Sequence, residues 1–261
     1  RCNRKAGNRC GSFGTTSARP GSADGTPKKR FRTLGIGIDM VTTLPRLTDA
    51  EIAHFLTEGY VHQRAVFAPE DVRVLTKDLN RLTVEGGGVV WTGPWKQGEE
   101  GHGFAIVKDL ATRSALWHDA CYDVLRPLAT PLLKKQEDVT VFEAVGIIKP
   151  PQIGQTFPLH QDGIYYGPID GDYVIANVYL DDWTPTNGSL QLVPRTHYSL
   201  LTHDQRGKKQ IPDETFPERV EPQALAGDVV WFHLWTVHGS QPNHSDLPRR
   251  TVRAGFTWNT P

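Results

Sequence analysis

Three residues in the second half of the chain have the types and spacing of a metal site. His160 and Asp162 are two positions apart, and on a β-strand such residues project from the same face. A second histidine, His238, follows much later in the sequence. Two histidines and one carboxylate, bound to one side of a metal with open positions opposite, are the ligands of non-haem Fe(II) oxygenases. The residues predict a metal centre of this kind, provided that the fold brings His238 to the other two.

An isolated His-x-Asp tripeptide also has a simpler explanation, a surface histidine beside a turn aspartate. The segments around the second histidine favour the metal site. Residues 227–233, GDVVWFH, are typical of a turn that leads into a strand, and His238 follows shortly afterwards within His-Gly-Ser. The ligand types alone leave the metal open, because divalent metals compete for the same nitrogen and oxygen donors.

Before residue 139 the sequence predicts helices that would support the site without taking part in it. Residues 47–59 begin with a capping box formed by Thr48 and Glu51 and end at a glycine. A second helix begins at Pro69, and a third is expected over residues 108–125, ending before a proline. The apolar positions expected to face the core are Ile52, Phe55 and Leu56 in the first helix and Val72, Leu75, Leu79 and Leu82 in the second.

From residue 139 onward the sequence changes to short β-type runs separated by glycine, proline and asparagine. Their spacing predicts a mainly β fold, an antiparallel sandwich or jelly roll flanked by the helices. In such a fold, strands of both sheets can aim side chains into one opening, so distant histidines can meet. A glycine-rich segment at residues 86–103 is either a binding loop or a connector. The predicted strands lie at residues 139–148, 156–162, 173–180, 189–194, 228–234 and 251–258.

The length and composition fit a single domain. The chain has 261 residues, of which 38% are hydrophobic, and no apolar run is long enough to span a bilayer. Basic and acidic residues are equal in number, so the chain has no overall attraction for nucleic acid or membranes. Its three cysteines form no disulfide framework or zinc motif, which is compatible with a reducing cytoplasm. We expect a cytoplasmic monomer or small homo-oligomer.

The charge is unevenly distributed along the chain. Residues 1–39 hold nine Lys or Arg and two Asp, whereas the remainder holds 20 basic and 27 acidic residues. With little to bury, residues 1–39 are expected to be a disordered basic leader or a non-native extension, and residues 40–261 a single domain. The leader could also be a transit peptide or a nucleic-acid arm, and Met40, the only methionine, could be the natural start.

Several segments together resemble the phytanoyl-CoA dioxygenase family of Fe(II)/2-oxoglutarate oxygenases. The resemblance extends over about residues 45–258. It implies a double-stranded β-helix (jelly roll, cupin-like) core and the use of Fe(II), 2-oxoglutarate and O₂ to hydroxylate or otherwise oxidise a C–H bond, with release of succinate and CO₂. The matching segments are PLHQD (158–162), NGSLQLVPRTH (187–197), GDVVWFH (227–233) and HGSxxN (238–243), followed by Arg249.

The resemblance also implies roles for individual residues. His160, Asp162 and His238 would bind the iron, and no catalytic residue is expected beyond these ligands. A carboxylate at position 162 implies hydroxylation, because halogenating relatives carry glycine or alanine there. Arg249 would hold the far carboxylate of 2-oxoglutarate, because arginine offers a planar fork of donors. The alternatives to Arg249 are Arg250 and Arg253, and two further cosubstrate contacts are expected from Ser240 and Asn177.

Aromatic residues near the predicted opening are candidates for contact with the substrate. These are Trp95, Tyr165, Tyr166 and Trp235, although aromatic residues near a β core are often simply packed. Two other functions remain compatible with the residues. One is a cupin-like metal protein with hydrolase or isomerase chemistry, and the other is a sensor that binds the metal without turnover.

Overall fold

Two antiparallel sheets face each other, and the helices lie outside the larger one. We describe a computed structural model in which residues 46–91, 103–134, 138–152, 155–166, 172–204 and 210–258 are defined. Residues 44–261 cluster as one compact unit. The predicted leader, residues 1–39, lies outside the described residues, so its disorder stays a prediction.

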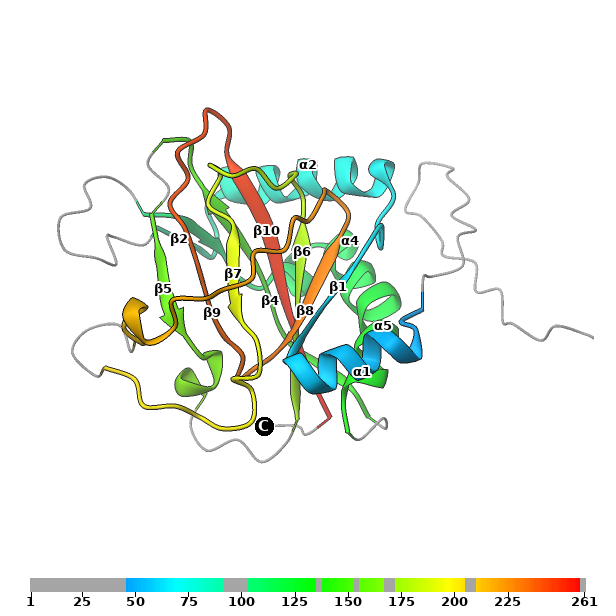
Figure 1. Ribbon diagram of the computed structural model, residues 1–261. Helices are drawn as coiled ribbons and strands as arrows, with labels where there is room; N and C mark the ends of the chain where they lie inside the picture. Colours follow the sequence, from blue (N-terminus) through cyan, green and yellow to red (C-terminus); the bar gives the residue numbers. More distant parts are fainter. Residues whose placement is uncertain are drawn as a thin grey trace, which may run out of the picture. The chain divides into compact units, whose positions relative to one another are not determined.

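The larger sheet has seven strands in the order β1-β8-β6-β10-β4-β3-β2, and the smaller sheet has the order β5-β9-β7. All of the paired strands run antiparallel, and the two sheets stand one in front of the other in Figure 1. This arrangement confirms the predicted jelly roll. The strands are β1 (Tyr60–Gln63), β2 (Val89–Trp91), β3 (Ala105–Val107), β4 (Thr140–Lys149), β5 (Phe157–His160), β6 (Tyr173–Tyr179), β7 (Leu190–Val193), β8 (Val229–His233), β9 (Val237–Ser240) and β10 (Arg249–Thr257).

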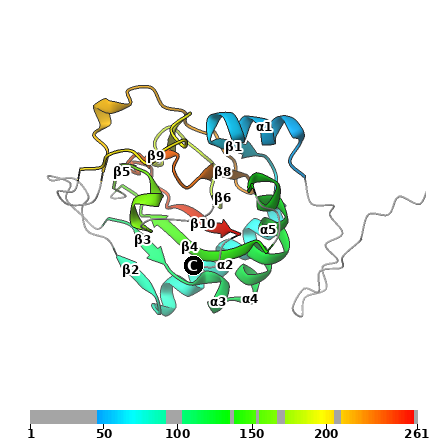
Figure 2. The ribbon, with the colours of Figure 1, turned by 90° about the horizontal axis from the view of Figure 1, so that it is seen from below.

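The helices cover the outer face of the larger sheet (Figures 1 and 2). The main ones are α1 (Asp49–Glu58) and α2 (Pro69–Glu85). A run of shorter helices follows, made of α3 (Leu110–Arg113), α4 (Ala115–Asp119), the π-helix η1 (Ala120–Leu125), α5 (Arg126–Ala129) and the 3₁₀ turn η2 (Thr130–Leu132). Two further 3₁₀ turns are η3 (Asp162–Tyr165) and η4 (Asp213–Thr215).

The two long helices follow their sequence signals closely. Thr48 and Glu51 form the predicted capping box of α1, and Gly59 ends the helix in the left-handed conformation. All four apolar positions predicted for α2 are buried. One assignment in α1 was wrong, because Leu56 is 54% exposed and only Phe55 of that face is fully buried.

The third predicted helix differs from expectation. Instead of one helix over residues 108–125, the chain breaks at Ser114, which is extended, and continues beyond Pro127. A proline inside a helix lacks an N–H donor and crowds the carbonyl four residues earlier. The helix widens just before Pro127, where the Arg126 N–H donates to the carbonyl of Cys121, five residues back. This π-helical turn allows the helical path to pass the proline.

The two faces of strand β10 have different surroundings. One packs into the core with the helices, and the other faces the smaller sheet. Val252, Ala254 and Phe256 belong to the core shared with the helices. The alternate residues Arg249 and Arg253 face the other way, where they line a cavity between the sheets. Strand alternation thus places two arginines, four positions apart, on the cavity side.

Helix α2 is fixed to the sheet by Leu79, which is 0% exposed. Its side chain lies over Gly146 of β4, where an added Cβ would come within 2.5 Å of a Leu79 methyl carbon.

Leu79→Ala should lower the free energy of unfolding by about 2–5 kcal/mol, because a cavity would remain under the helix. Urea unfolding followed by circular dichroism measures this. The matched control is Val84→Ala on the same helix, where the valine is 88% exposed and a change of less than about 0.5 kcal/mol is expected. Equal losses in the two variants would contradict this packing.

Candidate metal centre

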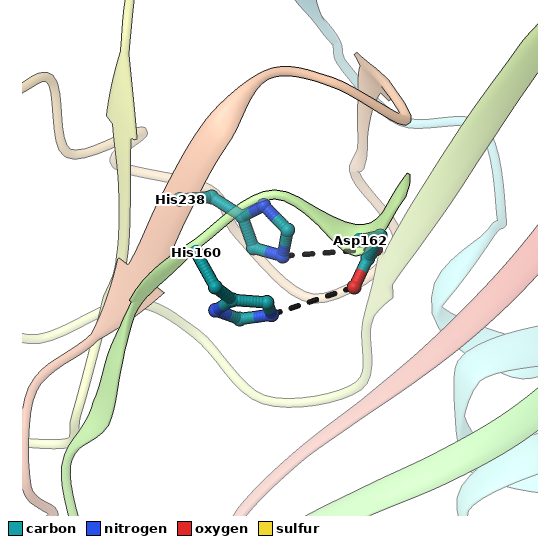
Figure 3. A group of neighbouring side chains, drawn as sticks. All are labelled: His160, Asp162 and His238. Atoms are coloured by element: carbon teal, nitrogen blue, oxygen red, sulfur yellow. Dashed lines mark ion pairs between the residues drawn. The ribbon is translucent and has the colours of Figure 1, made fainter. Parts of the chain in front are cut away.

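The two histidines meet because β5 and β9 are neighbours in the smaller sheet. His160 and His238 are direct partners in the antiparallel register, and their ring centroids lie 4.4 Å apart. The i, i+2 spacing predicted Asp162 on the same strand as His160, but β5 ends at His160, and Asp162 stands two residues further on, at the start of η3. Both imidazoles point toward this carboxylate in Figure 3.

The three side chains converge on one buried point. Nε2 of His160 lies 3.4 Å from Oδ1 of Asp162, and Nε2 of His238 lies 3.7 Å from Oδ2. The three candidate ligand atoms lie within 4.8 Å of one another. All three residues are buried, and Asp162 is only 2% exposed.

Backbone contacts orient both imidazoles. Nδ1 of His160 lies 2.8 Å from the carbonyl oxygen of Pro158, and Nδ1 of His238 lies 2.9 Å from that of Thr236. A carbonyl only accepts, so each Nδ1 carries a proton, and the Nε2 atom of each ring faces Asp162. Burial lowers the pKa of His238 to about 4, although Asp162 opposes this shift. His238 is therefore neutral at physiological pH, as a metal ligand must be.

The Asp162 carboxylate is charged and has one oxygen available. Burial alone would raise the pKa of Asp162, but the Arg253 guanidinium beside the carboxylate opposes burial, and the pKa lies below its ordinary value. Its Oδ2 atom is buried and makes no hydrogen bond with the described residues. A buried anionic oxygen without a donor, beside Nε2 of His238 and in a cluster that includes His160, fits a divalent cation. The donor set thus suits Fe(II).

A cavity next to these residues has an arginine on its opposite side. Arg249 is 6% exposed and lines the cavity together with Ser240 and Asn177. Its guanidinium donates to the Thr251 hydroxyl (2.9 Å) and the Gly188 carbonyl (2.7 Å). Among the described residues Arg249 forms no ion pair, and its Nε has no acceptor. Burial lowers the pKa of Arg249, and Tyr179 and Asp181 oppose this shift only in part.

The sequence did not point to two of the polar groups beside Arg249. Thr251 is on the same strand and holds the guanidinium, while Tyr179 is its partner on β6. The Tyr179 hydroxyl is buried and, like Arg249 Nε, forms no hydrogen bond with the described residues. The spacing of two between Arg249 and Thr251 could have identified Thr251. Only strand pairing brings Tyr179 to this place.

The two alternative arginines have other partners. Arg250 faces away from the cavity and pairs with Asp181 at 2.6 Å. Arg253 lines the cavity, but its Nη1 lies 2.7 Å from Oδ1 of Asp162 and its Nη2 pairs with Glu143. Arg249 is thus the cavity arginine without an acidic partner among the described residues. Glu143, which reaches the centre through Arg253, was not identified from the sequence.

The residue between the ligands, Gln161, ties the centre to its surroundings. Its side chain is fully buried, and its amide nitrogen donates to the carbonyls of Thr196, Ser199 and Trp235. Its amide oxygen accepts from the backbone N–H of Leu201. These bonds connect the turn after β5 to the chain just before β9, which carries the other histidine.

The predicted substrate residues lie at different distances from the centre. Tyr165 is half exposed, and its ring centroid is 6.0 Å from that of His160. The Tyr166 hydroxyl accepts from Arg253 at 3.3 Å. Trp235 packs against Gly163, the residue after Asp162, and against His233. The fourth, Trp95, lies outside the described residues.

Known proteins match both the sequence and this arrangement. Residues 55–251 match the family described as phytanoyl-CoA dioxygenase (PhyH). A probable alpha-ketoglutarate-dependent hypophosphite dioxygenase of Stutzerimonas stutzeri is 24% identical over 218 residues, which cover 77% of this chain and 76% of that protein. An ectoine dioxygenase of Bordetella bronchiseptica is 30% identical over 138 residues, 44% of this chain and 45% of the relative.

Solved structures share the fold. The non-heme alpha ketoglutarate dependent carbocyclase SnoK from nogalamycin biosynthesis superposes with a TM-score of 0.67 at 21% sequence identity, covering 83% of this chain and 86% of SnoK. The family match extends over about three quarters of the chain and includes all three converging residues. The chain belongs to the phytanoyl-CoA dioxygenase family and is a non-haem Fe(II)- and 2-oxoglutarate-dependent oxygenase.

Proposed function

We propose that His160, Asp162 and His238 bind Fe(II), and that the enzyme uses it to oxidise a C–H bond of a small organic substrate. One observation carries this proposal. Two imidazole nitrogens and a carboxylate oxygen that lacks a hydrogen bond converge within 4.8 Å in a buried site. When bound, the iron with 2-oxoglutarate and O₂ supplies the oxidising chemistry, and succinate and CO₂ are released.

Arg249 is the proposed anchor for the far carboxylate of 2-oxoglutarate. A buried guanidinium with an unused Nε can form charge-assisted hydrogen bonds with a carboxylate, and such bonds are stronger than neutral ones. Ser240, which is two residues from His238 and lines the same cavity, offers a hydroxyl to the cosubstrate. Asn177 offers an amide from the opposite sheet. These contacts would orient 2-oxoglutarate between Arg249 and the metal.

Aromatic side chains flank the proposed ligands and exclude water from them. The Phe157 ring stacks on the His160 ring, with ring centroids 5.1 Å apart. The ring centroids of Phe232 and His238 are 4.6 Å apart. Both phenylalanines also line the cavity. Keeping water out strengthens the electrostatic interactions within the site and limits side reactions.

The substrate is proposed to enter past the tyrosines that follow Asp162. Tyr165 and Tyr166 are both partly exposed while remaining next to the ligand set, so they can contact a molecule from the solvent side. Trp235 and Trp95 are the further candidates for this contact. The aromatic residues favour a mid-sized natural-product or lipid-like molecule, whose carbon surface can pack on the rings.

By their names, one relative acts on ectoine and another on hypophosphite. Both names are consistent with a small-molecule substrate. Among the described residues, no helix is both long and apolar enough to cross a bilayer. A cytoplasmic location and a monomer or small homo-oligomer remain our proposals.

The proposed function is tested with the purified protein under anaerobic conditions. Addition of Fe(II) and 2-oxoglutarate should produce a weak visible charge-transfer band, and admission of O₂ should then yield succinate. A screen for compounds that stimulate succinate release identifies the substrate class. If the protein binds zinc tightly, develops no band and hydrolyses a test compound instead, the proposal is wrong.

Replacement of a proposed ligand should abolish succinate formation. In His160→Ala or Asp162→Ala, the two remaining ligands cannot hold Fe(II) in competition with water. The measurements are the iron content after desalting and succinate formed per enzyme. His244→Ala is the matched control, since His244 is exposed and belongs neither to the converging ligands nor to the cavity lining. A ligand variant with wild-type turnover would remove that residue from the metal site.

Arg249→Lys should weaken the binding of 2-oxoglutarate while iron stays bound. Lysine keeps the charge but loses the planar fork of donors. Hydrogen bonds to charged groups contribute about 1.5–3 kcal/mol, so the 2-oxoglutarate requirement should rise about 10- to 100-fold. Titration of the charge-transfer band measures it. Arg250→Lys, on the other face of the strand, is the control. An unchanged requirement in the Arg249 variant would move the role to another residue.

A further inference from the structure

Arg253 contacts the proposed metal ligand Asp162 in a specific way. Its Nη1 lies 2.7 Å from Oδ1 of the carboxylate, whereas Oδ2 makes no hydrogen bond with the described residues. The two oxygens of Asp162 are therefore unequal. Oδ1 lies beside the Arg253 guanidinium and 3.4 Å from Nε2 of His160, whereas Oδ2 faces Nε2 of His238 at 3.7 Å.

This inequality matters for the number of coordination positions. A carboxylate can bind a metal through one oxygen or through both. Three monodentate protein ligands would leave about three coordination positions of an octahedral metal open. These would be enough for a bidentate cosubstrate and O₂. If Asp162 were bidentate, only two coordination positions would stay open, and either the cosubstrate or O₂ could not bind fully.

We infer that Arg253 is a positioning residue that holds Oδ1 of Asp162 and so leaves Oδ2 as the single oxygen available to the metal. This inference rests on the proposed function of the His160, Asp162 and His238 centre. It assigns Arg253 a role distinct from that of Arg249, which has no acidic partner among the described residues.

Arg253 would repel a divalent metal if its charge were not balanced. Its second arm, Nη2, donates to Glu143 on the neighbouring strand β4 and to the hydroxyl of Tyr166. Glu143 and Arg253 are each largely buried, with side chains 19% exposed. Because Glu143 offsets the charge, Arg253 can stand beside the metal site without making it cationic overall. Burial lowers the pKa of Arg253, but Asp162 and Glu143 outweigh burial and raise it, so the guanidinium stays charged.

The fork shape of arginine explains the residue type. One guanidinium contacts two carboxylates that come from separate elements, Asp162 at η3 and Glu143 at β4. A lysine ammonium is a compact point charge and cannot present two donors in a fixed plane. The position of Arg253 along the sheet is fixed by strand pairing. The Arg253 backbone pairs with Asn177 of β6 on one side and with Val145 of β4 on the other.

The test uses the full chain with two variants of the positioning pair. Arg253→Met frees Oδ1 of Asp162, and Glu143→Gln keeps a hydrogen-bond acceptor while removing the balancing charge. Both should weaken Fe(II) binding by about 10- to 100-fold, the range typical of groups that orient metal ligands. Anaerobic competition with a coloured chelator measures the affinity. On iron-loaded Glu143→Gln, in which Arg253 still holds Oδ1, the 2-oxoglutarate titration should stay close to that of the wild type, because Arg249 is intact.

The matched control is Arg250→Met, which breaks a similar ion pair with Asp181 on the other face of the same strand. It should lower thermal stability without changing Fe(II) affinity. Arg253→Lys tests the fork and keeps the protein folded if the methionine variant does not fold. It should bind Fe(II) more weakly than wild type and more tightly than Arg253→Met.

Two results would overturn the inference. One is wild-type Fe(II) affinity in Arg253→Lys and Glu143→Gln, with only the loss of stability that Arg250→Met shows. The other is a large loss of 2-oxoglutarate affinity with iron binding unchanged, which would make Arg253 a cosubstrate anchor instead. Failure of the proposed function is distinguishable from both, because the wild-type protein would then bind no Fe(II) and develop no band.

Discussion

The centre depends on the antiparallel register between β5 and β9. This pairing sets His160 directly opposite His238, although the two are far apart in the sequence. A shift of one residue would turn one of the histidines to the other face of the sheet. The register is held by more than the two short strands, because Gln161 ties the end of β5 to the segment that precedes β9. The polar centre thus relies on hydrogen bonds that are themselves buried.

The electrostatics of the cavity follow from what each charge faces. Asp162 is an anion paired with Arg253, yet one of its oxygens has no hydrogen-bond partner among the described residues. Arg249 is a cation with no acidic partner among them. Uncompensated buried groups cost free energy in the protein alone, and a divalent metal and a dicarboxylate would satisfy them.

The larger sheet and its helices provide a rigid support for this site. The outer face of β10 packs into the core with the helices, and its inner face presents Arg249 and Arg253 to the cavity. A strand that is buried on both faces has little freedom to shift, so the spacing between the two arginines is fixed. The proposed metal ligands therefore lie on short strands and a turn, and the larger sheet with its helices supports them.

Much of this was predictable from the sequence because the signals are local. Strand alternation, capping boxes and the spacing of His160 and Asp162 involve neighbouring residues, so they predicted the long helices, the six β runs and the ligand types. The third helix was mispredicted, since a π-helical turn lets it pass Pro127. Only the tertiary structure decided which arginine lacks an acidic partner, because the pairs Arg253–Glu143 and Arg250–Asp181 join residues far apart in the sequence. The residue types determined what chemistry was available, and long-range strand pairing decided which charges meet, because the sequence does not encode register locally.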